Sequence, residues 1–252
     1  MVLRSQLIIK KAANALLASL LILALVWISV LRLGVRFDFS FIIQFRSRIL
    51  QGFLMTVALS LAGFVLSLLI GIVAALWQNG KILFLKYVSS IYINFIRGTP
   101  LIMQIYLFYY IIGTAWGVSN RFLSGVLILS AFEGAYIAEI IRGGIQGLAT
   151  TQLEAAKAVG FTKSQTVKLV IIPQLIARIL PALVGQFSSI IKDSSLLSII
   201  AVIELTQTIR EISALNFRLF ESYLFLGVLY LCLTIPLAIV GKAFEKHYSF
   251  DT

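Results

Sequence analysis

Long apolar segments, separated by short polar or turn-forming joints, run along almost the whole chain. A helix rises about 1.5 Å per residue, so about 20 apolar residues cross a hydrocarbon core of about 30 Å. The segments of that kind are 12–30, 54–77, 87–113, 122–141, 175–200 and 219–240. The pattern therefore predicts an all-α polytopic membrane protein with six transmembrane segments.

The first apolar segment, 12–30, has basic residues on both sides. Lys10 and Lys11 precede it, as basic residues precede the core of a signal peptide. The segment is longer than a signal-peptide core of about 7–15 residues, and it ends at Arg32 without an obvious small-residue cleavage site. An uncleaved transmembrane helix is therefore favoured over a signal peptide.

The basic residues also indicate the orientation, because cytoplasmic loops of membrane proteins are enriched in Lys and Arg. A cytoplasmic N-terminus places Lys81, Lys86 and the polar loop 142–173 on the cytoplasmic side. Arg46 and Arg48 lie on the opposite side and work against this orientation. On balance we expect the loop 142–173 to be cytoplasmic.

Composition supports a membrane protein and excludes several other classes. Apolar residues make up 60% of the chain and charged residues 12%, against about 45–50% and about 25% in soluble domains. The net charge of +11 comes from short basic clusters between apolar runs, which is not the pattern of a nucleic-acid-binding module. One cysteine and one histidine are too few for a disulfide framework or a usual zinc site.

The chain also lacks the motifs of a nucleotide-binding or catalytic site. Gly80-Lys81 and Gly241-Lys242 have neither the upstream glycine spacing nor the following Ser or Thr of a phosphate-binding loop. The single histidine, His247, lies in the C-terminal tail, away from any nucleophile and acid. We expect a protein that binds no nucleotide, metal or cofactor itself and catalyses no reaction.

The polar loop 142–173 has its own helical pattern. Residues 152–159 are rich in Ala, Glu, Lys and Leu, which favour a helix. Gly160 allows a backbone break, Ser164 is a candidate cap for a second helix to about residue 170, and Pro173 should interrupt the next segment. The sequence therefore predicts two short helices joined at a glycine and held outside the bilayer.

Ionisable residues lie within the fourth and fifth apolar segments: Glu133, Glu139, Lys192 and Asp193. A charge at bilayer depth is costly and normally faces protein or a water-filled path. These residues could pair with the amino and carboxyl groups of a solute, or they could form structural ion pairs. We interpret Glu139 as structural, since Arg142 follows it at i,i+3.

Two further polar features admit two interpretations each. Gln186, Ser188 and Ser189 could face a polar path or bridge helices. The segment Arg97-Gly98-Thr99-Pro100 places a break before an aromatic run. Interrupted helices often line cavities in transporters, but Gly and Pro are also common in membrane helices without such a role, and aromatic runs often form interfacial belts.

The loop residues resemble a known docking element. Glu154-Ala155-Ala156, then Gly160, then Val170-Ile171-Ile172-Pro173 are similar to the cytoplasmic coupling loop of ABC-importer permeases, although Val170 and Ile172 replace the more usual Ile and Leu. The resemblance implies that Glu154, Ala155, Ala156 and Gly160 dock onto an ATPase subunit, with Pro173 at the end of the motif. The alternative is an ordinary amphipathic loop helix.

Other motifs are similar to the polar amino acid branch of the same family. In chain order they are Arg97-Gly98-Thr99-Pro100-Leu101, Gly134-Ala135-Tyr136-Ile137-Ala138-Glu139, Arg142-Gly143-Gly144-Ile145, Pro173-Gln174, Lys192-Asp193-Ser194-Ser195-Leu196 and Glu204-Leu205-Thr206. The resemblance implies a five-helix type I ABC-importer permease core plus one extra N-terminal transmembrane helix. The expected domains are 1–50, the permease domain 51–243 and a cytoplasmic tail 244–252.

By this resemblance the chain is the permease subunit of an importer of polar amino acids in the bacterial cytoplasmic (inner) membrane. Two permease subunits, identical or related, would enclose the path. A pair of ATPase subunits would bind ATP and magnesium, and an extracytoplasmic amino-acid-binding protein would deliver the solute. The alternative is a stand-alone ion-coupled secondary carrier or channel, which explains the buried charges but gives the loop 142–173 no purpose.

Overall fold

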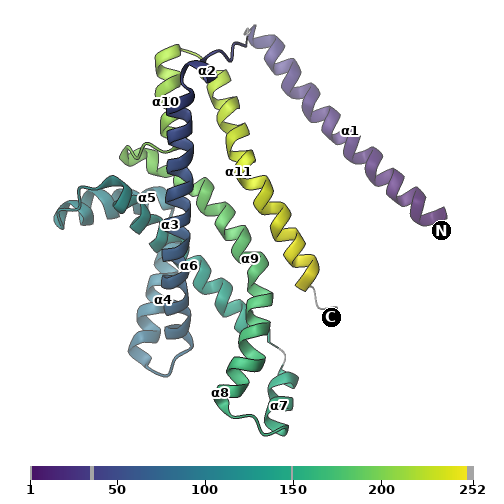
Figure 1. Cartoon of the computed structure of the whole chain (residues 1–252), viewed down its shortest axis with the longest axis vertical. Helices are drawn as coiled ribbons and strands as arrows, with labels where there is room; N and C mark the ends of the chain where they lie inside the picture. Colours follow the sequence, from purple (N-terminus) through teal and green to yellow (C-terminus); the bar gives the residue numbers. More distant parts are fainter. Residues whose placement is uncertain (1, 35–36, 149, 249–252) are drawn as a thin grey trace. The chain divides into compact units, whose positions relative to one another are not determined.

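The computed structural model describes residues 2–34, 37–148 and 150–248 (Figure 1). Within these ranges the chain forms helices and connecting turns and no strand. The predicted all-α class is therefore confirmed.

The chain divides into two compact units at residues 40 and 41. The first unit contains helix α1, Val2–Leu33. It begins before and ends after the predicted segment 12–30, and its apolar part includes Leu16–Ser29. The large apolar side chains described in that part, such as Leu20 and Leu23, are at least half exposed.

The second unit is a helical bundle. Its elements are α2 Phe41–Gln44, α3 Arg46–Asn79, α4 Leu83–Gly98, α5 Leu101–Tyr106, the π-helix η1 Leu107–Gly113, α6 Arg121–Gln146, α7 Thr150–Ala158, α8 Lys163–Gln165, the π-helix η2 Thr166–Ile171, α9 Ile172–Asp193, the 3-10 helix η3 Ser194–Ile200, α10 Leu205–Asn216 and α11 Leu219–Tyr248. In Figure 1, α10 lies at one end of this unit and α7 and α8 at the other.

Helices α3 and α6 form the centre of the bundle and approach closely at two glycines. A Cβ atom at Gly71 would lie 2.6 Å from Cγ2 of Ile137, and one at Gly134 would lie 2.7 Å from Cγ2 of Ile70. The missing side chain of each glycine thus leaves room for an isoleucine side chain of the opposite helix. Small residues allow such close packing between helices in a membrane, where apolar burial alone does not drive association.

The predicted segment 87–113 is a helix broken in the middle and not one straight span. The segment Leu101–Gly113, which comprises α5 and η1, is bent by 114° relative to α4. The bend arises because Thr99 and Pro100 have extended backbones, as the residue before a proline favours. The Gln104 amide donates to the Ile96 carbonyl at 2.8 Å and to Thr99 Oγ1 at 2.8 Å. The break expected at Arg97–Pro100 is present, and Gln104 satisfies one of the carbonyls that it frees.

The segment 163–200 is one long helical element, although the sequence predicted a break at Pro173. It is a single candidate span, Lys163–Ile200, so the second loop helix does not end near residue 170. Pro173 lies in the first turn of α9. Its missing N–H is accommodated by the wider π-helical turn η2 just before it.

Four helices are long and apolar enough to span a membrane within the described residues, and the bent pair α4 and α5–η1 can supply a fifth span. These are α3, α6, the element 163–200 and α11. With the bent pair they correspond to five of the six predicted segments, and the chain is a multi-pass membrane protein. The sixth, 12–30, lies in α1, whose apolar stretch Leu16–Ser29 is shorter than these spans.

Candidate functional site

The loop between α6 and α9 is built by two specific helix ends. At the end of α7, the Phe161 N–H donates to the Ala156 carbonyl and the Gly160 N–H to the Lys157 carbonyl, each at 3.0 Å. This pair of bonds is a Schellman motif, and Gly160 has the left-handed φ of +83° that the motif requires. The glycine thus ends α7 with the carbonyl groups of Ala156 and Lys157 paired.

The second loop helix starts with a capping box at Thr162. Its Oγ1 accepts from the Gln165 N–H at 3.3 Å, and the Gln165 side chain accepts from the Thr162 N–H at 2.8 Å. The predicted cap, Ser164, is instead the second residue of this helix. The Thr162–Gln165 spacing is the usual capping-box signature, so the sequence carried the correct signal.

The predicted docking residues differ in exposure. Glu154, Ala155, Gly160 and Pro173 are exposed, whereas Ala156 is only 6% exposed and packs inside the chain. The loop also exposes apolar side chains that the sequence analysis did not select. Val159 is 76% exposed, and Val167 and Leu169 are also exposed. Apolar residues within a polar loop were the available signal for this surface.

The loop is tied firmly to the two helices that it connects. The Arg178 guanidinium of α9 donates to the carbonyl of Gly147 at the end of α6. The Gln174 side-chain amide of α9 donates to the Gln152 side chain of α7. The loop is therefore fixed to the ends of both α6 and α9.

The same two helices hold a buried polar cluster inside the bundle. Glu133 of α6 is fully buried, and the Gln186 amide of α9 donates to its Oε2. Its other oxygen, Oε1, has no hydrogen-bond partner in the described part of the chain. The Asp193 carboxyl lies close to the Glu133 carboxyl and repels its charge, whereas the Lys192 ammonium attracts it.

Ser189 extends this arrangement along α9. It is partly buried and lies one turn after Gln186, so the two share a helix face. The structure thus brings together the predicted path residues Glu133, Gln186, Lys192 and Asp193, with Ser189 on the face of Gln186. A buried carboxylate oxygen without a partner is unusual in a folded protein.

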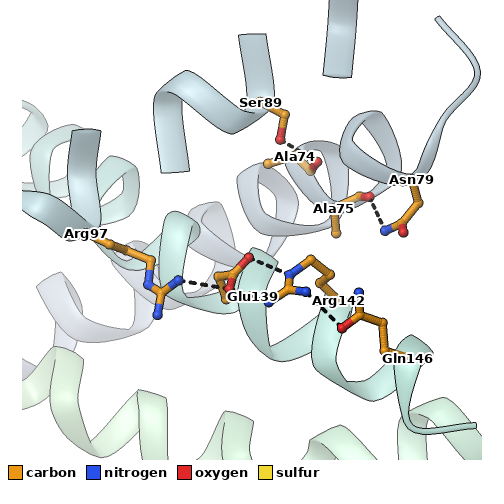
Figure 2. Close-up of polar contacts among 8 residues, drawn as sticks. All are labelled: Ala74, Ala75, Asn79, Ser89, Arg97, Glu139, Arg142 and Gln146. Atoms are coloured by element: carbon orange, nitrogen blue, oxygen red, sulfur yellow. Dashed lines mark hydrogen bonds and ion pairs between the residues drawn. The ribbon is translucent and has the colours of Figure 1, made fainter. Parts of the chain in front are cut away.

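Glu139 belongs to a separate ion network (Figure 2). Its Oε1 accepts from Arg142 Nε at 2.7 Å, and its Oε2 lies 2.9 Å from Arg97 Nη1. Arg142 also donates to Gln146 at 2.8 Å, and the Arg97 guanidinium lies over the Tyr136 ring at 5.6 Å from its centre. One carboxylate therefore connects the end of α4, just before the break, to α6.

The sequence analysis selected Glu204 only as part of a motif, and the structure places it in a third polar cluster. Its carboxylate caps α10 by accepting from the N–H groups of Thr206 at 2.8 Å and Gln207 at 2.7 Å. Tyr230 of α11 donates to it at 3.1 Å. Burial raises the pKa of the Glu204 carboxyl to about 7, although these hydrogen bonds oppose the shift.

Across the described ranges, His, Cys, Asp and Glu side chains do not gather in groups of three or more as a metal site would require.

Comparison with known sequences identifies a family and its members. Residues 67–250 match the family described as binding-protein-dependent transport system inner membrane component. The chain is 34% identical over 206 residues to the probable glutamine ABC transporter permease protein GlnM of Bacillus subtilis (strain 168), covering 80% of this chain and 95% of that protein. It is 33% identical over 213 residues to the glutamine transport system permease protein GlnP of Escherichia coli (strain K12), covering 84% and 97%.

Solved structures give the same fold. A crystal structure of an amino acid ABC transporter with histidines has a TM-score of 0.78 and 34% identity, and the match covers 84% of this chain and 100% of that one. An inward-facing MetNI methionine ABC transporter has a TM-score of 0.67 at 18% identity, with 82% and 99% covered. The predicted permease fold is therefore confirmed.

Proposed function

The chain belongs to the family of binding-protein-dependent transport system inner membrane components, and from this membership we propose that it is the permease subunit of an ATP-driven importer of polar amino acids. The relatives named for glutamine and the amino acid transporter of similar structure support this solute class. The family's description as an inner membrane component supports a place in the bacterial cytoplasmic membrane.

One observation carries the mechanism. The loop 147–171 is anchored to α6 and α9 through Arg178 and Gln174, and the Glu133–Gln186 contact joins the same two helices inside the bundle. A protein that docks on the loop therefore acts on the two helices that hold the buried polar cluster. A stand-alone carrier has no use for such an arrangement.

In this proposal the docked protein is an ATPase subunit. Glu154, Ala155 and Val159 are exposed on and just after α7, where they supply a charge, a small residue for close approach and an apolar contact. A pair of ATPase subunits binds ATP and magnesium, closes, and moves the loops of two permease subunits. An extracytoplasmic binding protein delivers the solute to the opposite side.

The Glu133 cluster serves as the solute path. A free carboxylate oxygen suits the ammonium group of an amino acid, and the Lys192 ammonium suits a carboxylate. Gln186 orients the Glu133 carboxylate through the other oxygen. The Arg97–Glu139–Arg142 network stays structural, because both oxygens of Glu139 are engaged by arginines.

The test is a charge reversal at the loop, Glu154→Lys, in the tagged full-length chain purified in mild detergent. We expect an ATPase to co-purify with the wild type and the associated hydrolysis to fall about ten-fold or more in the variant, because reversed charges at an interface cost several kcal/mol. Glu245→Lys is the matched control, since Glu245 is also exposed and lies on α11.

Retention of the ATPase and of solute uptake by Glu154→Lys would contradict the docking role. A wild-type chain that purifies alone and still moves solute in vesicles would instead favour an ion-coupled carrier.

A further inference from the structure

A groove opens between α3 and α4. It has a volume of about 480 Å³, and its lining includes Leu69, Val73 and Trp77 of α3 and Val88, Ser89 and Tyr92 of α4. Leu69, Val73, Trp77 and Val88 are each more than a third exposed, so the groove is open along its side. We propose that it binds one acyl chain of an anionic phospholipid whose headgroup contacts Lys81 and Lys86.

The floor of the groove is apolar because its two hydroxyl groups are already engaged within the protein. Ser89 Oγ donates to the Ala74 carbonyl at 2.7 Å (Figure 2), and the Tyr92 hydroxyl donates to the Ala131 carbonyl at 2.6 Å. An amino acid or other polar solute would lose its hydration there without gaining hydrogen bonds. The lining therefore favours a hydrocarbon occupant.

The length of the groove suits a lipid tail. At about 1.5 Å per residue, the stretch of α3 from Leu69 to Trp77 is about 12 Å long. Half of a hydrocarbon core of about 30 Å is about 15 Å. The groove thus covers most of one leaflet's depth and ends at Trp77, a residue type enriched where membrane meets water.

The positive charge at the Trp77 end of the groove favours an anionic lipid headgroup. Lys81 and Lys86 lie in and just after the turn that joins α3 to α4, next to Trp77 and Val88, and both are exposed. Neither lysine forms an ion pair within the described residues, and α3 and α4 contain no Asp or Glu. An anionic phosphate would neutralise this positive end, and basic residues beside membrane helices attract anionic lipids in this way.

Trp77 is a built-in reporter of an occupied groove. With Trp27→Phe and Trp116→Phe, it becomes the only tryptophan of the full-length chain. The chain is reconstituted into vesicles with phosphatidylglycerol or phosphatidylcholine brominated on the acyl chain, and quenching of Trp77 fluorescence gives the relative affinity. We expect phosphatidylglycerol to bind about five-fold more tightly for each lysine engaged, since a basic residue near the surface contributes about 1 kcal/mol.

Two variants test the two halves of the site. Lys81→Gln with Lys86→Gln should bring the two lipids to equal affinity, whereas Lys242→Gln with Lys246→Gln on α11 should leave the preference unchanged. Val73→Phe should fill the groove and reduce quenching by both lipids. Leu76→Phe is its control, because Leu76 is 62% exposed on the same helix and does not line the groove.

Equal affinities of the wild type for the two lipids would overturn the headgroup assignment. So would an equal loss of the phosphatidylglycerol preference in the Lys81/Lys86 and Lys242/Lys246 double variants. No quenching by either lipid would overturn the groove as a lipid site and indicate that protein covers it. The lipid site is independent of the transported solute, so failure of either proposal leaves the other testable.

Discussion

Glu133 and Glu139 lie on the same helix, but their surroundings give them different chemistry. Both oxygens of Glu139 face arginines, so its charge is neutralised within the protein. Glu133 is buried, Gln186 donates to one of its oxygens, and the other has no hydrogen-bond partner within the described residues, although Asp193 and Lys192 lie nearby. Only Glu133 retains the capacity to bind a further group.

The neutral variant Glu133→Gln tests that capacity. The amide carbonyl can still accept from Gln186, but the side chain no longer offers a negative charge to an ammonium group. We expect solute uptake to fall about ten- to hundred-fold, since hydrogen bonds to charged groups contribute about 1.5–3 kcal/mol. Initial uptake rates against solute concentration, with membrane expression checked, provide the measurement.

Glu245→Gln removes a charge from an exposed position of α11 and should leave uptake unchanged. Normal uptake by Glu133→Gln at normal expression would assign Glu133 to helix packing.

Local spacing explains which of these residues could be interpreted from the sequence. The Glu139–Arg142 contact follows from an i,i+3 spacing, so it could be predicted. Arg97 reaches Glu139 only because α4 packs beside α6, and no local pattern encodes that contact. The burial of Ala156 likewise depends on the fold around α7.

Among the elements, the junction at Gly160 combines an exposed position with a demanding backbone. A Cβ atom there would meet nothing within 4 Å, but φ is +83°. Any cost of a side chain is therefore backbone strain and not a clash. The strain would fall on the end of α7, where the proposed docking residues lie.

Gly160→Ala should therefore destabilise the end of α7 by about 1–2 kcal/mol, the cost of a left-handed conformation for a residue with a Cβ. We expect faster amide hydrogen exchange across 150–162. Gly185→Ala is the matched control, because Gly185 also has open space around its Cβ position but has no positive φ and lies inside α9, where alanine favours the helix.

Unchanged exchange in Gly160→Ala, or the same increase in Gly185→Ala, would show that the left-handed position does not determine the stability of this junction.

The positions of the helices could be predicted from the lengths of the apolar segments. Whether a helix continues through a proline could not. Pro100 and Pro173 look alike in sequence, and each was expected to interrupt a helix. Pro100 follows an extended Thr99 and ends α4, whereas Pro173 follows a π-helical turn that lets the helix continue. The difference lies in the backbone of the preceding turn, which tertiary packing determines.

At the scale of the whole molecule, the bundle separates two polar ends. The loop with α7 and α8 lies at one end and α10 at the other (Figure 1). The apolar helices between them require opposite sides of a membrane. The charge distribution predicts that the loop is cytoplasmic, and this orientation remains a prediction.

Labelling of single cysteines tests the orientation. Replacing Cys232 by serine removes the only native thiol, and Ser164→Cys or Leu215→Cys then adds one thiol at each exposed end. In intact spheroplasts we expect a membrane-impermeant maleimide to label Leu215→Cys and to label Ser164→Cys only after permeabilisation.

The reverse pattern would place the loop outside the cell and exclude a cytoplasmic ATPase as its partner. Labelling of both thiols in sealed spheroplasts would contradict the separation of the two ends by a membrane.

In the proposed transport cycle, the continuous element Lys163–Ile200 would transmit motion along its length. Its 38 residues extend about 57 Å at about 1.5 Å per residue, more than the about 40–45 Å of a bilayer with its headgroups. Gln186, which holds Glu133, lies closer to the Ile200 end than to the loop end. A pivot at Gln186 would leave the longer arm on the side of the loop, so a displacement of the docked protein would reach the region beside α10 as a smaller one.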